Sequence, residues 1–334
     1  MTANDVTRLL EHYVDKSRVL PWRSPPGSAP PDPYRVWLSE IMLQQTTVAA
    51  VIPRFERFVA RWPSLGALAA ADDAEVLGEW AGLGYYARAR NLIACARRVA
   101  AMGGFPKSSA ELRQLPGIGA YTSSAIAAIA FGEAAPAVDT NIARVISRYW
   151  ALAQPLRADV ENRMSDIVAA GPAGDIVQAL MDLGATICLP ARPQCTTCPL
   201  REGCRAFASG IPEAFPAPRP KKVRPQRFGI AYWIERDRSL WLVRRPARGL
   251  LGGMAALPGD DWSGEAAAAG DAIRVRHVFT HFALELAIVE RAELSGEGWW
   301  QPIDRLDQAG LPTLYRKAVA AMLEARSKQL PRAA

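Results

Sequence analysis

The chain has 334 residues, and half of them are hydrophobic, which is enough for two domains with apolar cores. No apolar run approaches the ~18 residues that a membrane-spanning helix needs, so we expect a soluble, intracellular protein without a membrane partner. Lysine and arginine outnumber aspartate and glutamate by 40 to 33, and the net charge of +7 is compatible with a polyanionic partner without identifying one.

Up to about residue 216 the apolar spacing predicts helices, and one of them, PYRVWLSEIMLQQT, carries an acidic residue beside an apolar stripe. Trp37, Ile41, Gln44 and Val48 form the stripe, and Glu40 lies next to it. Most glutamates in helices are simply solvated. A glutamate buried beside Trp37 would instead have its pKa raised from ~4.3 toward neutrality, where it can donate a proton.

The next unusual segment is GLGYYARARNL, residues 82–92, where a glycine-rich turn meets a helix. It contains two adjacent tyrosines and two arginines. A tyrosine buried in the core and an aromatic wedge between stacked bases are equally compatible with this pattern.

LPGIGAY, residues 115–121, lies between two short helical segments, the first opened by a capping box of Ser108 and Glu111. Gly117 and Gly119 allow a tight hairpin and leave N–H groups unpaired at the start of the next helix, where a phosphate can bind. An ordinary turn between helices has the same pattern. The motif VDTNIARVISR, about twenty residues later, favours the hairpin.

Asp139 directly precedes that helical motif, so we expect it to cap the helix at the amides of Asn141 and Ile142. A carboxylate held by amides keeps a low pKa and stays anionic. Together, Glu40 as an acid and Asp139 as an anion would suit cleavage of a glycosidic bond through an oxocarbenium-like state.

Four cysteines follow in the pattern Cys188-x6-Cys195-x2-Cys198-x5-Cys204, and the only other cysteine is Cys95. A secreted disulfide framework is disfavoured because the N-terminus has no secretory signal pattern. Zinc ribbons usually pair two C-x2-C knuckles, whereas this segment has one. The spacing favours an iron–sulfur cluster, with zinc and unligated thiols as open alternatives.

Composition divides the chain into a helical region at 1–210, which holds the candidate catalytic pair Glu40 and Asp139, a linker rich in proline and basic residues at 211–227, and a second domain at 228–326. The hairpin lies at 108–131 and the cysteine loop at 188–204. In the second domain Phe228, Ile230 and Tyr232 alternate, as does ALELAIVE near residue 286, before a terminal helix. We therefore predict an α+β domain with antiparallel strands.

These motifs together carry a resemblance to a known family. SEIMLQQT, GLGYYARARNL, LPGIGAYT, the Asp139-x-Asn141 pair, MDLGATIC before the cysteines and HVFTHF span residues 20 to about 325. In this order and spacing the chain resembles the A/G-specific adenine DNA glycosylases, the MutY family of the helix-hairpin-helix, or endonuclease III, superfamily. The resemblance implies an all-α helix-hairpin-helix glycosylase fold with an iron–sulfur loop, followed by an α+β Nudix-like domain.

The implied activity is monofunctional removal of adenine mispaired with 8-oxoguanine or guanine in double-stranded DNA. Glu40 would protonate adenine at N7, and Asp139 would stabilise the sugar cation or its adduct. Asn141 would order the site, and Tyr121 would pack against the sugar. The four cysteines would hold a 4Fe-4S cluster whose loop presents basic residues to DNA. A monomer in the bacterial cytoplasm, at the nucleoid, is implied as well.

The resemblance also implies contacts with the damaged duplex. Gln45 and Tyr85 would insert around the oxidised guanine, and Asp182 would contact the adenine edge. His281 of the second domain would contact the 8-oxoguanine strand, although a histidine satisfied within a sheet is the plainer interpretation. The remaining residues expected at DNA are Gln44, Arg23, Gly117, Gly119 and Thr280.

Three features differ from the related patterns. Thr140 stands where the family has glycine, which puts the local backbone in question, and Thr280 replaces a serine but keeps the hydroxyl. The segment after RGLLGGMAALPG lacks the glutamates that hold magnesium in Nudix hydrolases, so we expect a binding module.

Two alternative functions remain open from the sequence. A bifunctional endonuclease III-like glycosylase and AP lyase needs an amine to form a Schiff base, and this chain has Tyr121 at that place. A non-catalytic lesion-binding protein would need neither Glu40 nor Asp139, yet both are present.

Overall fold

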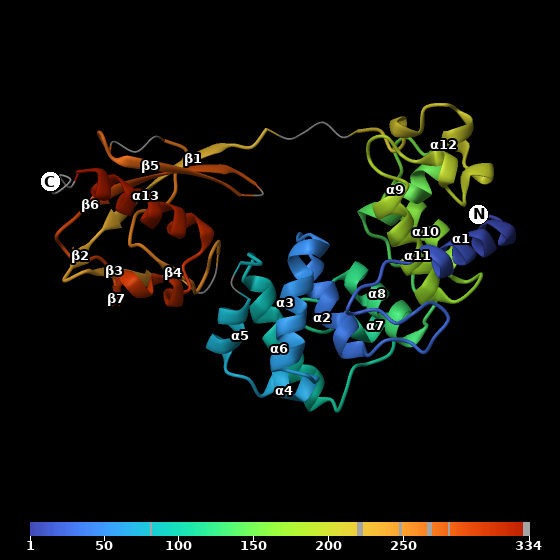
Figure 1. Ribbon diagram of the computed structural model, residues 1–334, viewed down its shortest axis with the longest axis horizontal. Coiled ribbons are helices and arrows are strands. Elements are labelled where there is room, and N and C mark those ends of the chain that lie inside the picture. The colour runs from blue at the N-terminus through green and yellow to red at the C-terminus, as the bar shows by residue number, and fades with distance from the viewer. Residues whose placement is uncertain (81, 219–222, 247–248, 266–268, 280, 330–334) are drawn as a thin grey trace. The chain divides into compact units, whose positions relative to one another are not determined.

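A computed structural model describes residues 1–80, 82–218, 223–246, 249–265, 269–279 and 281–329 (Figure 1). The chain divides into two compact units, residues 1–73 with 88–220 and residues 74–87 with 221–334. The division after residue 220 falls within the predicted linker, whereas the grouping of 74–87 with the second unit was not anticipated. The predicted domain boundaries stay predictions. Among the described residues no helix is long and apolar enough to cross a bilayer.

The first unit is built of helices, as predicted from the apolar spacing. The longer ones are α1 (Ala3–Lys16), α2 (Pro33–Leu43), α3 (Val48–Arg61), α6 (Ala87–Ala101), α8 (Ala120–Phe131), α9 (Thr140–Tyr149), α10 (Arg157–Val168) and α11 (Ala173–Thr186). Shorter helices are α4 (Leu65–Ala69), α5 (Asp73–Glu79, which runs into the second unit), α7 (Ser109–Leu112), α12 (Arg205–Ala208) and the 3-10 turns Cys195–Thr197, Arg201–Gly203 and Pro212–Ala214.

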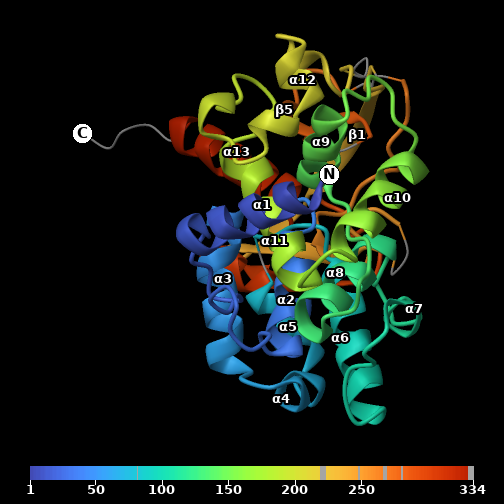
Figure 2. The ribbon, with the colours of Figure 1, turned by 90° about the vertical axis from the view of Figure 1, so that its right-hand side faces the viewer.

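The centre of this unit is formed by α2, α8 and α11. Nearly every residue of α8 from Thr122 to Ala130 is buried, as expected for a helix that is apolar on all sides. It packs against α2 on one side and α11 on the other, and α11 also contacts α9 and α1. In both ribbon views α1 lies along α11 (Figures 1 and 2). A polar side chain on the inner faces of these helices is therefore removed from bulk water.

The described part of the second unit contains two sheets and one long helix. Its elements are β1 (Gln226–Trp233), β2 (Glu235–Arg236), β3 (Ser239–Arg244), β4 (Ala255–Ala256), β5 (Ile273–Val278), β6 (Ala283–Glu290), β7 (Gly298–Pro302), a 3-10 segment at Ile303–Ala309 and α13 (Thr313–Gln329). One sheet has the order β1-β6-β5; in the other, β3 pairs with β2, β4 and β7. Helix α13 contacts β5 and β6, and Leu314 and Ala318 enter the core beside Leu284 and Leu286.

The prediction of antiparallel strands is wrong for one pair. β1 runs parallel to β6, with Gln226 opposite Ala283 and Trp233 opposite Glu290, while the other named pairs are antiparallel. A parallel pair needs a long crossover connection, and here residues 234–282 supply it. Alternation along each strand predicted the strands themselves but carries no information on their direction.

Candidate active site

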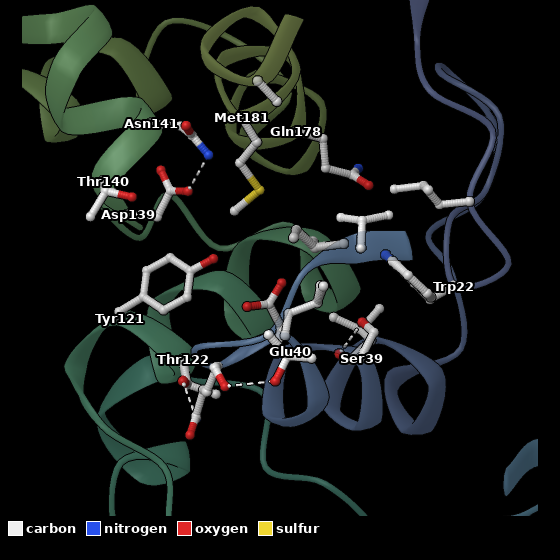
Figure 3. A pocket seen from close by; sticks show the side chains of 18 of the residues that line it. Trp22, Ser39, Glu40, Tyr121, Thr122, Asp139, Thr140, Asn141, Gln178 and Met181 are labelled. Carbon is white, nitrogen blue, oxygen red and sulfur yellow. Dashed lines mark hydrogen bonds between the residues drawn. The ribbon is translucent and has the colours of Figure 1, made fainter. Parts of the chain in front are cut away.

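One cavity of about 890 Å³ opens between α2, α8, α11 and the start of α9. Glu40, Tyr121 and Asp139 come from three different helices or helix ends and all line it. Figure 3 shows their side chains directed into the same space, with Met181 and Gln178 of α11 on another wall. Its size suits a small organic group. The cavity is also bordered by Asn141, which was predicted to order the site, and by five residues predicted to contact DNA: Gln44, Gln45, Arg23, Gly117 and Gly119.

Glu40 is one of the two carboxyls that line the cavity. It lies on α2 and only 7% of its surface is exposed. Burial raises the pKa of its carboxyl to about 7, the negative charge of Asp139 adds to the rise, and the Tyr121 hydroxyl and Arg23 oppose it. The prediction of a raised pKa is confirmed. The carboxyl can therefore hold a proton in the neutral pH range, where an exposed glutamate is ionised.

Asp139 caps α9, as predicted. Its Oδ1 accepts from the Ile142 amide at 2.7 Å, and its Oδ2 accepts from the Asn141 side-chain amide at 3.1 Å. The prediction that these bonds keep its pKa low is wrong, because burial raises the pKa of Asp139 by more than the hydrogen bonds lower it. The two hydrogen bonds still make the charged form of Asp139 less unfavourable than it would be if the carboxylate were buried without partners.

The amide of Asn141 is fixed from its other side by Arg144, which was not identified from the sequence. Arg144 Nη2 donates to Asn141 Oδ1 at 2.8 Å and to the Gly184 carbonyl oxygen at 2.7 Å. This bond orients the Asn141 amide so that its nitrogen faces Asp139. A Cβ added to Gly184 would lie 2.6 Å from Asn141 Cβ, so α11 approaches α9 as closely as only glycine allows.

Tyr121 lies in the first turn of α8 and faces both carboxyls. Burial and the nearby charges of Glu40 and Asp139 raise its pKa well above the usual value, so the hydroxyl keeps its proton. Thr140 is the first residue of α9 and has no positive φ. The helix start therefore does not require the glycine that the family pattern has there.

The geometry does not support the predicted contact of Asp182 with adenine. Asp182 is buried outside the cavity lining, and its two oxygens accept from Arg18 Nε and Arg23 Nη1, each at 2.7 Å. These arginines hold the pKa of the Asp182 carboxyl below its usual value against the effect of burial. Both arginines line the cavity, so Asp182 acts behind them and fixes where their charges lie.

The hairpin has the geometry that its glycines predict. Gly117 has a φ of 74°, and a Cβ there would lie 2.7 Å from Asn91 Cβ. Gly119 is the N-cap of α8 and, having no side chain, leaves the first turn without a side-chain acceptor. The start of α8 can therefore donate to an anion at the cavity edge.

Gln45 and Tyr85, both predicted to insert into DNA, have strained backbones. Gln44 (φ −57°, ψ 112°) and Gln45 (φ 58°) form a type II turn, closed by the Thr46 amide donating to the Leu43 oxygen at 3.2 Å. Gln45 is exposed. Tyr85 has a φ of 49° and is 50% exposed. A left-handed residue other than glycine costs about 1–2 kcal/mol, so both side chains are held outward at a cost.

The four cysteines of the loop surround one small cavity. Cys188, Cys195, Cys198 and Cys204 are free thiols and all line it. Arg148, which is 3% exposed, lies beside them and donates to Cys188 Sγ at 3.4 Å and to the Leu189 oxygen at 2.6 Å. In the part of the chain that the structure describes, no three potential ligands converge as a single metal ion requires.

Two residues of the second unit, His281 and Thr280, were predicted to contact the 8-oxoguanine strand. His281 is exposed at the turn between β5 and β6. Thr280 lies outside the described residues. The neighbouring Phe279 packs against Trp262, with 5.5 Å between the ring centroids, and against Phe282 at 4.9 Å. This aromatic group gives the turn a firm base.

Two different family models match the helical region and the second domain of the chain. A model of the HhH-GPD superfamily of base excision DNA repair proteins matches residues 38–170, and a NUDIX domain model matches residues 229–321. Among solved structures, a thermostable thymine-DNA glycosylase matches with a TM-score of 0.54 and 28% identity, over 61% of this chain and 95% of that one. The predicted fold class is confirmed by these matches.

Several similar sequences are adenine DNA glycosylases. Adenine DNA glycosylase of Mus musculus is 42% identical over 212 residues, which make up 60% of this chain and 41% of that protein. Adenine DNA glycosylase of Mycolicibacterium smegmatis is 41% identical over 221 residues, which make up 64% of this chain and 73% of that protein. The chain thus matches about two fifths of the mouse relative and nearly three quarters of the mycobacterial one.

Proposed function

We propose that this chain, which belongs to the adenine DNA glycosylase family, hydrolyses an N-glycosidic bond in double-stranded DNA. The bond is that of adenine mispaired with 8-oxoguanine or guanine. The observation that carries this proposal is the pairing of Glu40, with a pKa of about 7, and Asp139 in one cavity. An acid and an anion on either side of a nucleoside are what this bond cleavage needs.

The chemistry begins with a proton. Glu40 donates it to N7 of a flipped-out adenine, and the C1′–N9 bond then breaks with its electron pair leaving on the base. The positive charge left on the sugar lies near Asp139, which stabilises it by charge or by a transient adduct. Water attacks C1′ and its proton returns to a carboxylate, giving free adenine and an abasic site. Tyr121 packs against the sugar and keeps its hydroxyl proton.

The cavity walls support binding of the base. Arg18 and Arg23, held by Asp182, place cationic donors at the edge of the purine, and Trp22 borders the same cavity. The hairpin and the uncapped start of α8 bind a phosphate of the flipped strand. Gln44 and Gln45 reach the gap left in the duplex, together with Tyr85. In the second unit, His281 and Thr280 contact the 8-oxoguanine strand.

We assign a 4Fe-4S cluster to the four cysteines. Their thiols line a common cavity, and a single C-x2-C knuckle with longer arms on both sides fits a cluster better than a zinc ribbon. When bound, the cluster serves as a structural cross-link. Arg148 holds the loop through Cys188, and Arg201 and Arg205 are exposed on it for contact with a DNA backbone.

The proposal also covers the extent of the reaction, the oligomeric state, the location in the cell and the role of each domain. Tyr121 cannot form a Schiff base, so the enzyme is monofunctional and leaves the abasic strand uncut. It acts as a monomer at the nucleoid in the bacterial cytoplasm. The helical region at 1–210 carries the chemistry, and 228–326, joined by the linker 211–227, recognises 8-oxoguanine without hydrolysing pyrophosphates.

A strand-scission assay tests the proposal. Duplexes with adenine opposite 8-oxoguanine, guanine or thymine are incubated with the protein and analysed with and without alkali. Adenine release opposite 8-oxoguanine and guanine, seen as scission only after alkali, supports it. Scission without alkali, with efficient borohydride trapping of a DNA adduct, would indicate a bifunctional enzyme instead. Tight lesion binding without adenine release would indicate a non-catalytic binding protein.

A further inference from the structure

The turn that carries Gln45 is held by a side chain from a different helix. Arg88 is the second residue of α6 and is half-buried. Its Nη1 donates to the main-chain oxygens of Ile41 and Met42, both at 3.0 Å, and its Nη2 donates to the Thr46 hydroxyl at 3.2 Å. The guanidinium therefore bonds to the chain on both sides of the turn.

The first two of these bonds satisfy the end of α2. The last carbonyl groups of a helix have no partner within the helix, and a cation at this end is also favoured by the helix dipole. Arginine suits the position because its planar group presents several donors in a fixed fork, whereas lysine presents one compact charge. Arg88 thereby fixes where α2 ends and where the turn begins.

The turn itself needs such support. Gln45 occupies the third position of a type II turn, where φ is positive and glycine is preferred. Backbone strain of this kind persists only when the surrounding structure over-determines it. A glutamine in a position that favours glycine indicates that the Gln45 side chain itself has a role. The Thr46 bond and the two carbonyl bonds supply the constraint from either side.

We propose that Arg88 is a positioning residue that keeps Gln45 in its left-handed conformation, with its side chain directed outward for insertion into the damaged duplex. What Gln45 contacts rests on the proposed function. Arg88 acts through the turn and has no contact with DNA in this scheme. Its loss leaves the Gln45 side chain present but free to relax with the backbone.

The test is a double-mutant cycle with Arg88→Met and Gln45→Gly. Affinity is measured for a duplex with 8-oxoguanine opposite 2′-fluoro-2′-deoxyadenosine, which resists cleavage, and for the same duplex without the lesion. We expect Arg88→Met to reduce the ratio of the two affinities about tenfold. In the Gln45→Gly background the turn is unstrained and the side chain is absent, so the same substitution should leave the ratio nearly unchanged.

Arg97→Met is the control, because Arg97 lies on the same helix and also donates to main-chain oxygens, those of Ala69 and Ala71, both at 3.3 Å, besides pairing with Asp73. It should keep the wild-type ratio. If Arg88→Met does not fold, Arg88→Lys and Thr46→Val weaken the same constraint and should lower the ratio in the same direction.

Two results would overturn the inference: an unchanged ratio in folded Arg88 variants, or an equal loss with and without Gln45. A failure of the proposed function looks different, because then the wild-type protein itself neither prefers the lesion duplex nor releases adenine from its cleavable counterpart.

Discussion

Arg144 and Cys188 are joined by a hydrogen bond of 2.7 Å from the guanidinium Nε to the main-chain oxygen. The same guanidinium holds Asn141, and Asn141 donates to Asp139. The loop of the four cysteines is thus connected to the carboxylate of the cavity through two side chains. We predict that order in that loop and order in the active site are coupled through this connection.

We predict that Arg144→Met slows adenine release about 10²-fold, since a small misplacement of catalytic groups has effects of this size. Duplex affinity should change little, because Asn141 and Asp139 remain present. Single-turnover rates and binding titrations measure the two effects. Arg35→Met is the control, because Arg35 is exposed and donates to the Pro21 oxygen at 3.3 Å, away from Asn141 and the cysteine loop. A wild-type rate in Arg144→Met would separate the loop from the chemistry.

The rate of adenine release should depend on pH through Glu40. The proton donor is present below its pKa of about 7 and is lost above it. Single-turnover rates should therefore be highest at or below neutrality and fall by about tenfold per pH unit in the alkaline range. A rate that rises as the pH passes from 6 to 8 would show that Glu40 works as a base.

The free energy of unfolding should depend on the same group, and in the same direction as the rate. In the unfolded chain Glu40 loses its proton near 4.5, whereas burial raises the pKa to about 7 in the folded protein. Between these values the folded state binds the extra proton, so its contribution lowers the free energy of unfolding as the pH rises. Above about pH 7 the loss is complete and of the order of 3 kcal/mol.

Glu40→Gln removes this titration. The variant should therefore gain stability relative to the wild type between pH 5 and pH 8, as measured by urea unfolding at both values. The same difference between variant and wild type at both pH values would contradict a buried, titrating carboxyl at position 40.

The cysteine loop should depend on its metal cluster. Protein purified without air should contain about four iron atoms per chain, as the cluster type implies, and should absorb in the visible range. Cys198→Ser should lose iron and unfold at a lower temperature, whereas Cys95→Ser changes a buried thiol outside the loop and should keep its iron. Zinc in place of iron would correct the assignment.

Much of the site could be predicted because its signals are local. The stripe around Trp37 made burial of Glu40 one of two alternatives, and the position of Asp139 before a helical motif indicated a cap. The pKa of Asp139 could not be predicted, since it depends on how deeply the assembled helices bury the carboxyl. Local spacing gives a hydrogen bond but not its surroundings.

The partners that Arg88, Arg144 and Asp182 have in the fold could not be predicted from the sequence, for a similar reason. Arg88 bonds to residues more than forty positions away, and Arg144 reaches Cys188 across a comparable separation. Asp182 was expected at adenine, yet the fold places two arginines between it and the cavity. Charged residues are common along helices, so no pattern distinguishes those that become buried partners from those that stay solvated.

The most direct test compares wild type and Glu40→Gln on a duplex with adenine opposite 8-oxoguanine, under single-turnover conditions followed by alkali. Glutamine keeps the shape of the side chain but cannot deliver a proton. We predict that duplex affinity is retained while adenine release falls by at least the ~10²–10⁴ that a positioned acid contributes. Equal release by the two proteins would contradict the account, because the group buried at position 40 would then take no part in breaking the bond.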